Sequence, residues 1–201
     1  MLSIIEAAGW PIWPLILASI VALGIIVERL WSLRGSQIAP PKLLAAVVQE
    51  YKQKGITPEM LSRLSESSLM GRVFAAGLKN MNSSREVVKE SIEEAGRAAA
   101  HELERFLTTL GTIASVSPLL GLLGTVIGMV EIFGALTPTG GSPALLAHGI
   151  SVALYNTAMG LIVAIPSMIF FRYFRGKVTT LLVEMEQQAI KLVEIIHGER
   201  K

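Results

Sequence analysis

Formal charge is almost absent from one long stretch of this 201-residue chain. Between Phe106 and Phe171 there is no lysine, arginine or aspartate, and Glu131 is the only formally charged side chain. An aqueous core does not require such a clearing, whereas a bilayer does, because about 20 apolar residues span its hydrocarbon. The stretch is long enough for two passes, and the proline-, glycine- and serine-rich run 137–143 is typical of a turn. The sequence therefore predicts a transmembrane hairpin.

A second stretch without ionisable side chains, residues 10–27, predicts another span near the N-terminus. Trp10 and Trp13 mark one end and Trp31 the other, as expected of an aromatic belt. A cleavable signal peptide is the alternative interpretation. It is disfavoured because the first nine residues contain Glu6 and no base, and because small-residue cleavage chemistry is missing after the apolar stretch.

Lysine and arginine are missing from the N-terminal tail and from residues 137–147, and all 18 of them lie in residues 29–105 or 172–201. The positive-inside rule then places both basic regions in the cytoplasm, and the N-terminus and the hairpin turn outside. The expected layout is an outer N-terminus (1–9), transmembrane helices (10–30, 107–136 and 148–171), a cytoplasmic helical region (31–106), an outer turn (137–147) and a cytoplasmic C-terminal helix (172–201).

Residues that usually carry chemistry are scarce. The chain has no cysteine, which excludes a disulfide and a thiolate metal site, and no two of its three histidines share a helical turn. No nucleophile–base pair is visible, so we expect neither an enzyme nor a bound metal or cofactor. The net charge of +2 is too small to indicate nucleic-acid binding, whereas 51% hydrophobic residues and a mean hydropathy of +0.54 agree with a membrane protein.

Helical patterns fill the basic regions. Residues 42–54 have a helical period ended by Gly55, Thr57 can cap a second helix with Pro58 at its first position, and a third helix is expected at about 69–81. The run 83–86 reads as a capping box. From there helical character reaches about Leu136, which predicts one helix of about 50 residues, or about 75 Å, that crosses the bilayer and projects into the cytoplasm.

The last helix is expected to reverse that design. Ser142 and Pro143 suit its N-cap and first position, and helical character runs to about His197. An apolar stripe occupies its cytoplasmic part: Val178, Leu181, Leu182, Met185, Ala189, Leu192, Val193 and Ile196. The stripe needs a partner, and the charged half of the preceding long helix is the expected one.

Small and polar residues recur on one face of each hairpin helix. They are Ser117, Gly121, Gly124, Thr125 and Gly128 in the second span, and Gly149, Ala153, Asn156, Thr157, Gly160, Ala164 and Ser167 in the third. Close helix packing is one interpretation, and a pore lined by hydroxyls is the other. Without a titratable group near mid-membrane, the chain either scaffolds a pore or supplies half of one.

Four segments carry a family resemblance. Residues 113–129 resemble the second-span signature of the MotA/TolQ/ExbB proton-channel family, and residues 148–166 resemble its third-span signature. Residues 28–31 resemble the end of the first span in the ExbB branch, and residues 71–73 resemble a loop motif before the long helix. Length and the three-span plan point to the ExbB/TolQ branch, not to the four-span MotA branch.

The resemblance implies an all-α integral membrane protein with two very long helices that extend into the cytoplasm, assembled as a homopentamer in a bacterial inner membrane. The pentamer would enclose a dimer of a single-span ExbD/TolR-like partner that brings the essential aspartate. Proton flow would then drive work on the cell envelope or TonB-dependent transport, with a TonB-like protein as a further partner. Thr125 and Thr157 match the two pore-facing threonines, whereas Val152 stands where many relatives have glutamate.

The expected site residues combine the two threonines that the resemblance gives with the small and polar faces of the hairpin and its one charged residue. We expect a pore or proton pathway lined by Thr125, Thr157, Asn156, Glu131 and Ser117, and helix packing at Gly121, Gly124, Gly128 and Gly160, with the first span facing lipid. Glu131 is hypothesised to collect protons at the outer entrance, and its alternative is a glutamate that simply reaches interfacial water. A structural scaffold without conduction is the competing function. A small-solute transporter is disfavoured because no inverted repeat or unwound helix is visible.

Overall fold

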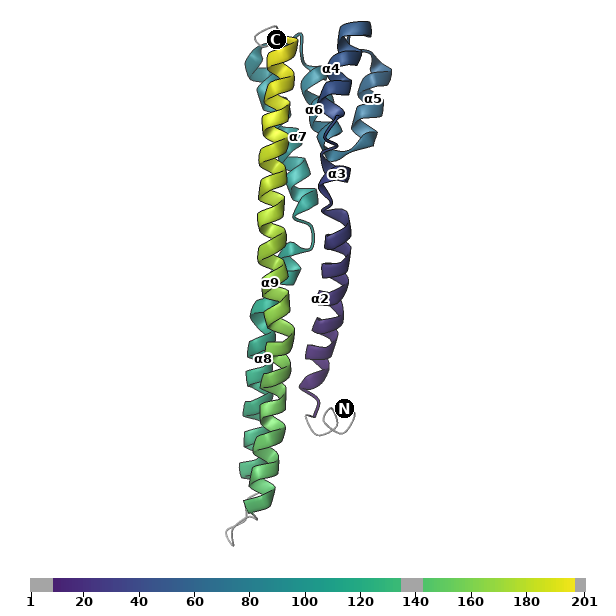
Figure 1. Cartoon of the computed structure of the whole chain (residues 1–201). Coiled ribbons are helices and arrows are strands. Elements are labelled where there is room, and N and C mark those ends of the chain that lie inside the picture. Colours follow the sequence, from purple (N-terminus) through teal and green to yellow (C-terminus); the bar gives the residue numbers. More distant parts are fainter. Residues whose placement is uncertain (1–8, 135–142, 198–201) are drawn as a thin grey trace. The chain divides into compact units, whose positions relative to one another are not determined.

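A computed structural model describes residues 9–134 and 143–197, and within these ranges the chain forms helices and no strand. The helices are α2 (Ile12–Ser32), α3 (Gly35–Ile38), α4 (Leu43–Lys54), α5 (Pro58–Ser67), α6 (Leu69–Lys79), α7 (Arg85–Leu103), α8 (Leu107–Gly134) and α9 (Pro143–Ile196) (Figure 1). The all-α prediction is therefore confirmed.

The chain divides into two compact units. Unit 1 comprises Met1–Glu28 and Phe106–Tyr173, and unit 2 comprises Arg29–Arg105 and Phe174–Lys201. Three stretches are long and apolar enough to cross a membrane: Ile12–Ser32, Leu107–Gly134 and Gly149–Ile196. Most of this apolar sequence belongs to unit 1, whereas nearly all of the charged sequence belongs to unit 2.

Exposed apolar side chains concentrate in unit 1. Among the described residues, the large apolar side chains exposed in unit 2 are only Leu30, Trp31, Val87, Val183 and Ile190, and the many others belong to unit 1. An aqueous surface does not carry an apolar area of this extent. Lipid or other transmembrane helices are its natural surroundings, so the helices of unit 1 form the membrane part of a membrane protein.

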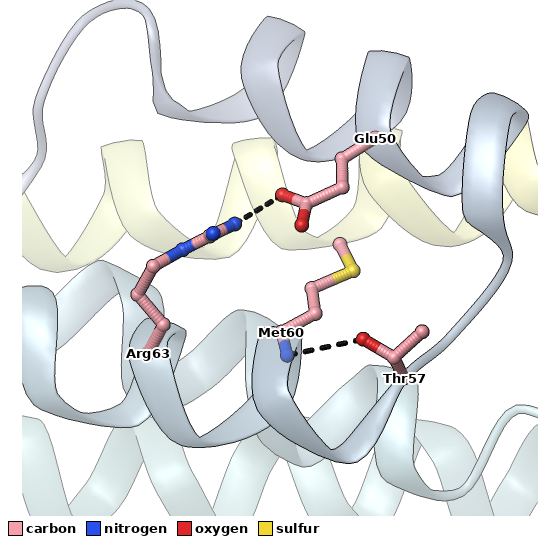
Figure 2. A network of polar contacts seen from close by, with 4 residues as sticks. All are labelled: Glu50, Thr57, Met60 and Arg63. Atoms are coloured by element: carbon pink, nitrogen blue, oxygen red, sulfur yellow. Dashed lines mark hydrogen bonds and ion pairs between the residues drawn. The ribbon is translucent and has the colours of Figure 1, made fainter.

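Short helices in unit 2 begin and end where the sequence signals predict. α4 stops at Gly55, whose φ of 69° lies in the left-handed region that favours glycine. Thr57 caps α5 by accepting a hydrogen bond of 3.2 Å from the amide of Met60, with Pro58 at the first position. Figure 2 shows this cap and the neighbouring ion pair between Arg63 of α5 and Glu50 of α4. Both predicted boundaries are confirmed.

The core of unit 2 is built around α6, which packs against α5 and α7. Met70, Val73, Phe74 and Leu78 of α6 are at most 2% exposed. The second part of α9 adds a buried apolar stripe: Phe174, Val178, Leu181, Met185, Ala189 and Leu192. This part of α9 runs beside α7 (Figure 1), and residues of α6, α7 and α9 line a groove there. The predicted pairing of the stripe with the charged helix is therefore present.

The prediction of one continuous helix from the capping-box run to about Leu136 is wrong, because this helix is broken. α7 ends at Leu103 and α8 begins at Leu107, and Phe106 between them has a φ of 62°. The predicted capping box is also wrong, since Ser84 is the N-cap of α7 and its side chain makes no capping hydrogen bond. By contrast, Pro118 and Pro166 interrupt neither α8 nor α9. Ser142 lies outside the described residues.

A buried arginine stabilises this break. The Arg29 side chain is 6% exposed, and its Nη1 donates a hydrogen bond of 3.3 Å to the carbonyl oxygen of Leu103, the last residue of α7. A helix C-terminus leaves carbonyls unpaired and carries partial negative charge, so a guanidinium is favoured there. Sequence periodicity could not reveal the break, because this contact joins residues 74 positions apart.

We expect Arg29→Gln to destabilise the protein by about 1–3 kcal/mol, because the buried Leu103 carbonyl loses a charged donor. Thermal unfolding in detergent micelles measures this effect. Arg63→Gln is the matched control, since that exposed arginine pairs with Glu50 at the surface and should change stability by less than about 1 kcal/mol. Equal shifts for the two variants would show that the Arg29 contact contributes nothing special.

Candidate functional site

Backbone contact between α8 and α9 defines the hairpin in unit 1, where the two helices run antiparallel and side by side (Figure 1). A methyl group at Gly121 would lie 2.7 Å from the carbonyl oxygen of Asn156, and one at Gly160 would lie 2.6 Å from that of Ser117. Further along, a methyl at Gly128 would lie 3.3 Å from Cβ of Ala153. Only glycine permits so close an approach of two backbones.

The buried residues of the hairpin repeat at steps of three and four, which is the pattern of a left-handed helix–helix seam. On α8 they are Leu110, Ala114, Ser117, Gly121 and Gly124; on α9 they are Ala153, Asn156, Gly160, Val163, Ala164 and Ser167. The α9 pattern continues into unit 2 with much larger side chains. In lipid there is no hydrophobic driving force for helix association, so small residues that allow tight packing form the helix contact in unit 1. In water, burial of large apolar side chains is favourable, and such side chains form most of the stripe in unit 2.

Two residues predicted to line a pore lie inside this seam instead of on an exposed side. Ser117 is 1% exposed and Asn156 is 2% exposed, and both contact the facing helix of the same chain. The hydroxyl of Ser117 has no hydrogen-bond partner among the described residues, whereas that of Ser167 donates to the carbonyl of Val163 at 2.7 Å. The three- and four-residue spacing, followed strictly, could have assigned Ser117 and Asn156 to the packed side.

The two threonines flank the seam on the same side. Thr125 and Thr157 are half-buried, and each follows a seam residue by one position, Gly124 on α8 and Asn156 on α9, which contact each other. One position is a rotation of about 100°. Because the helices are antiparallel, these rotations have opposite senses when both are viewed from one end, so both threonines turn toward the same side. The sequence alone could not show this, since it depends on which residues face each other.

Thr125 also borders a shallow apolar groove on the surface of α8. The groove is lined by Thr125, Val126, Met129, Val130 and Phe133. The Thr125 hydroxyl donates to the carbonyl of Leu122 at 2.7 Å, and its lone pairs can still accept a further hydrogen bond. This side of the hairpin therefore offers a hydroxyl beside an apolar surface, which suits an apolar helix that brings one polar group.

Glu131 lies on the other side of the hairpin. It is exposed and follows the seam residue Gly128 by three positions, which equals a rotation of about 60° in the sense opposite to that of Thr125. This position argues against a single proton pathway lined by both Glu131 and the two threonines. The side chain of Val152 lies outside the part of the chain whose side chains the structure describes.

Titratable residues are few in the hairpin: Glu131 on α8, and His148 and Tyr155 on α9. Apart from Glu131, the described part of α8 has no titratable side chain, and no metal-binding group of three His, Cys, Asp or Glu residues occurs among the described residues. Threonine hydroxyls can orient water or accept a hydrogen bond, but they do not bind and release protons near neutral pH.

Comparison with known proteins agrees with this arrangement. The model of the MotA/TolQ/ExbB proton channel family matches residues 65–187, which include α7, α8 and most of α9. The ExbB-like biopolymer transport protein 3 of Synechocystis sp. is 32% identical over 85% of this chain and 82% of its own length. Biopolymer transport protein exbB1 of Vibrio cholerae is 32% identical over 81% of this chain and 74% of its own.

A third relative represents the Tol branch. The Tol-Pal system protein TolQ of Pseudomonas aeruginosa is 32% identical over 88% of this chain and 74% of its own length. The resemblance to second- and third-span signatures and the three helices able to cross a membrane agree with these matches. This chain therefore belongs to the MotA/TolQ/ExbB proton channel family.

Proposed function

We propose that this chain is the pore-forming subunit of a proton-driven motor in a bacterial inner membrane. The observation that carries the proposal is the pair of threonines, Thr125 and Thr157, on one side of a hairpin whose opposing backbones are in contact. A rigid hairpin of this kind can form the wall of a channel, and its two hydroxyls can meet an ion-carrying group. The motor would convert the proton motive force into work for TonB-dependent transport or for another process at the cell envelope.

The proton carrier in this proposal is a carboxylate of a single-span ExbD/TolR-like partner. This chain contains no aspartate anywhere, and its only glutamate in the hairpin lies on the side away from the threonines. An aspartate on an apolar partner helix would supply the missing titratable group, and the groove beside Thr125 has the apolar lining that such a helix requires. A TonB-like protein is a further candidate partner.

The assembly that fits the proposal is a homopentamer around a partner dimer. In it, α8 and α9 line the pore with their threonine side, and α2 faces lipid with its exposed residues, which include Trp13, Leu17, Ile20 and Val27. The distribution of bases supports a periplasmic N-terminus and a cytoplasmic C-terminus.

Native mass spectrometry of the complex co-purified with its single-span partner tests the stoichiometry. We expect five copies of the 21.6 kDa chain with two copies of the partner. The partner's aspartate changed to asparagine serves as a control for activity, because it should abolish proton flux and keep the same mass. A complex of two chains, or a complex that never retains the partner, would refute the proposed assembly.

Proton flux through reconstituted complexes separates the motor from its competitor. A structural scaffold would assemble and yet leave proteoliposomes as proton-tight as empty ones. A motor subunit should raise the proton permeability of the vesicles, and only when the partner with its aspartate is present.

A further inference from the structure

An exposed arginine is stacked on an exposed tryptophan where the first span ends. The guanidinium carbon of Arg34 lies 4.9 Å from the ring centroid of Trp31, and both side chains are exposed, Trp31 by 63%. Trp31 is the penultimate residue of α2, and Arg34 is the second residue after the helix. Stacking on the ring restricts the guanidinium to one orientation and leaves its N–H groups available at the edge.

Arg34 has no carboxylate partner in the part of the chain that the structure describes, as is also true of exposed lysines such as Lys52 and Lys79. Arg63, Arg72, Lys89 and Arg97 are all within 4.0 Å of a glutamate. These four bases are thus neutralised locally. An unpaired guanidinium remains free to accept an anion from outside the protein.

Basic residues outnumber acidic ones in the sequence that follows α2. After Glu28 no acidic residue occurs until Glu50, whereas Arg29, Arg34 and Lys42 lie in that interval. On the neighbouring helix, Leu181 of α9 contacts the position of Gly35, at 3.7 Å from a methyl group placed there. Lys177 lies one helical turn before Leu181. The first acidic residue after Leu181 is Glu184, three residues farther along α9.

Apolar residues complete the surface. Val27 and Leu30 of α2 are 61% and 44% exposed; Val27 lies four residues before Trp31 and Leu30 directly before it. Apart from the exposed Glu28, the exposed residues change from apolar to aromatic to cationic along α2 and its end, in the order in which a phospholipid changes from acyl chain to glycerol to phosphate. Free phosphate would contact only the cation, whereas a phospholipid would contact all three zones.

We propose that Trp31 and Arg34 form a binding site for the phosphodiester of an anionic phospholipid. The guanidinium donates paired hydrogen bonds to the phosphate oxygens, and the indole ring packs beside the glycerol and upper acyl chain. The site fixes the depth of the first span in the membrane. A base near a lipid surface is worth about 1 kcal/mol for anionic lipid, which corresponds to about fivefold local enrichment.

Quenching of Trp31 fluorescence by brominated lipid tests the site in the full-length chain. Trp10→Phe and Trp13→Phe leave Trp31 as the only tryptophan. The chain is reconstituted in phosphatidylcholine vesicles that contain either brominated phosphatidylglycerol or brominated phosphatidylcholine at the same mole fraction. We expect phosphatidylglycerol to quench several-fold more, Arg34→Gln to remove this excess, and Arg63→Gln to preserve it.

Three outcomes would overturn the proposal. Equal quenching by the two brominated lipids would show no preference for anionic headgroups. An excess that survives Arg34→Gln would show that general surface charge attracts the lipid. Displacement of the excess by soluble glycerol phosphate would identify a site for free phosphate esters. Quenching by brominated phosphatidylcholine, equal in all variants, verifies that the span remains inserted.

Discussion

Gly160→Ala is expected to destabilise the α8–α9 hairpin by about 1–3 kcal/mol, because the added methyl has no room. It would lie 2.6 Å from the carbonyl oxygen of Ser117 and 3.2 Å from Cα of Gly121. Both neighbours are backbone atoms and cannot rotate away, so the two helices must separate. Thermal unfolding of the complex in detergent, followed by circular dichroism, measures the loss.

Gly24→Ala on α2 is the matched control for this experiment. Gly24 is also a glycine within a membrane-spanning helix, and a methyl group there would have no neighbour within 4 Å. Alanine favours a helix over glycine by up to about 1 kcal/mol, so Gly24→Ala should be neutral or stabilising. If Gly160→Ala were as stable as Gly24→Ala, the backbones of α8 and α9 would not be in contact.

Thr157→Val is expected to lower proton flux about fivefold or more while the complex still assembles. Valine keeps the shape of threonine and removes only the hydroxyl, and a hydrogen bond of this kind in a membrane contributes on the order of 1 kcal/mol. Thr157→Ser should restore flux because it restores the hydroxyl. The measurement is proton uptake by proteoliposomes that contain the complex with its partner.

Thr112→Val controls for loss of a threonine as such. Thr112 is exposed on α8, and its hydroxyl already donates to the carbonyl of Thr108 at 2.9 Å within its own helix. Complexes with Thr112→Val should therefore show the proton flux of the unsubstituted protein. If Thr157→Val kept full flux, Thr157 would serve only packing, and the scaffold alternative would gain support.

Glu131→Gln gives the contrasting result if the threonine side lines the pore. Since Glu131 lies on the opposite side of the hairpin from Thr125, we now expect its substitution to leave flux unchanged. This expectation reverses the proton-collecting role hypothesised from the sequence. Reduced flux without dissociation of the complex would restore that role and would place the outer entrance between neighbouring subunits.

Much of the architecture follows from the sequence because its causes are local. A run without charge indicates a membrane span whatever it packs against, and Gly55, Thr57 and Pro58 act on the backbone of their own or adjacent turns. The spacing of the seam residues along α9 is likewise visible in the sequence, because the repeat along one helix can be read without knowledge of the helix that packs against it. The family signatures coincide with these same small and polar residues.

Contacts between distant residues decided the rest. Next to the break at Phe106, the end of α7 accepts a hydrogen bond from Arg29, which lies far away in the sequence. Ser117 and Asn156 are buried, while Thr125 and Thr157 are half-buried, because the register of two antiparallel helices selects which side of each is covered. Composition and helical periodicity determine which residues share a face of one helix. Only the packing of the second helix determines which of these faces is buried and which residues it contacts.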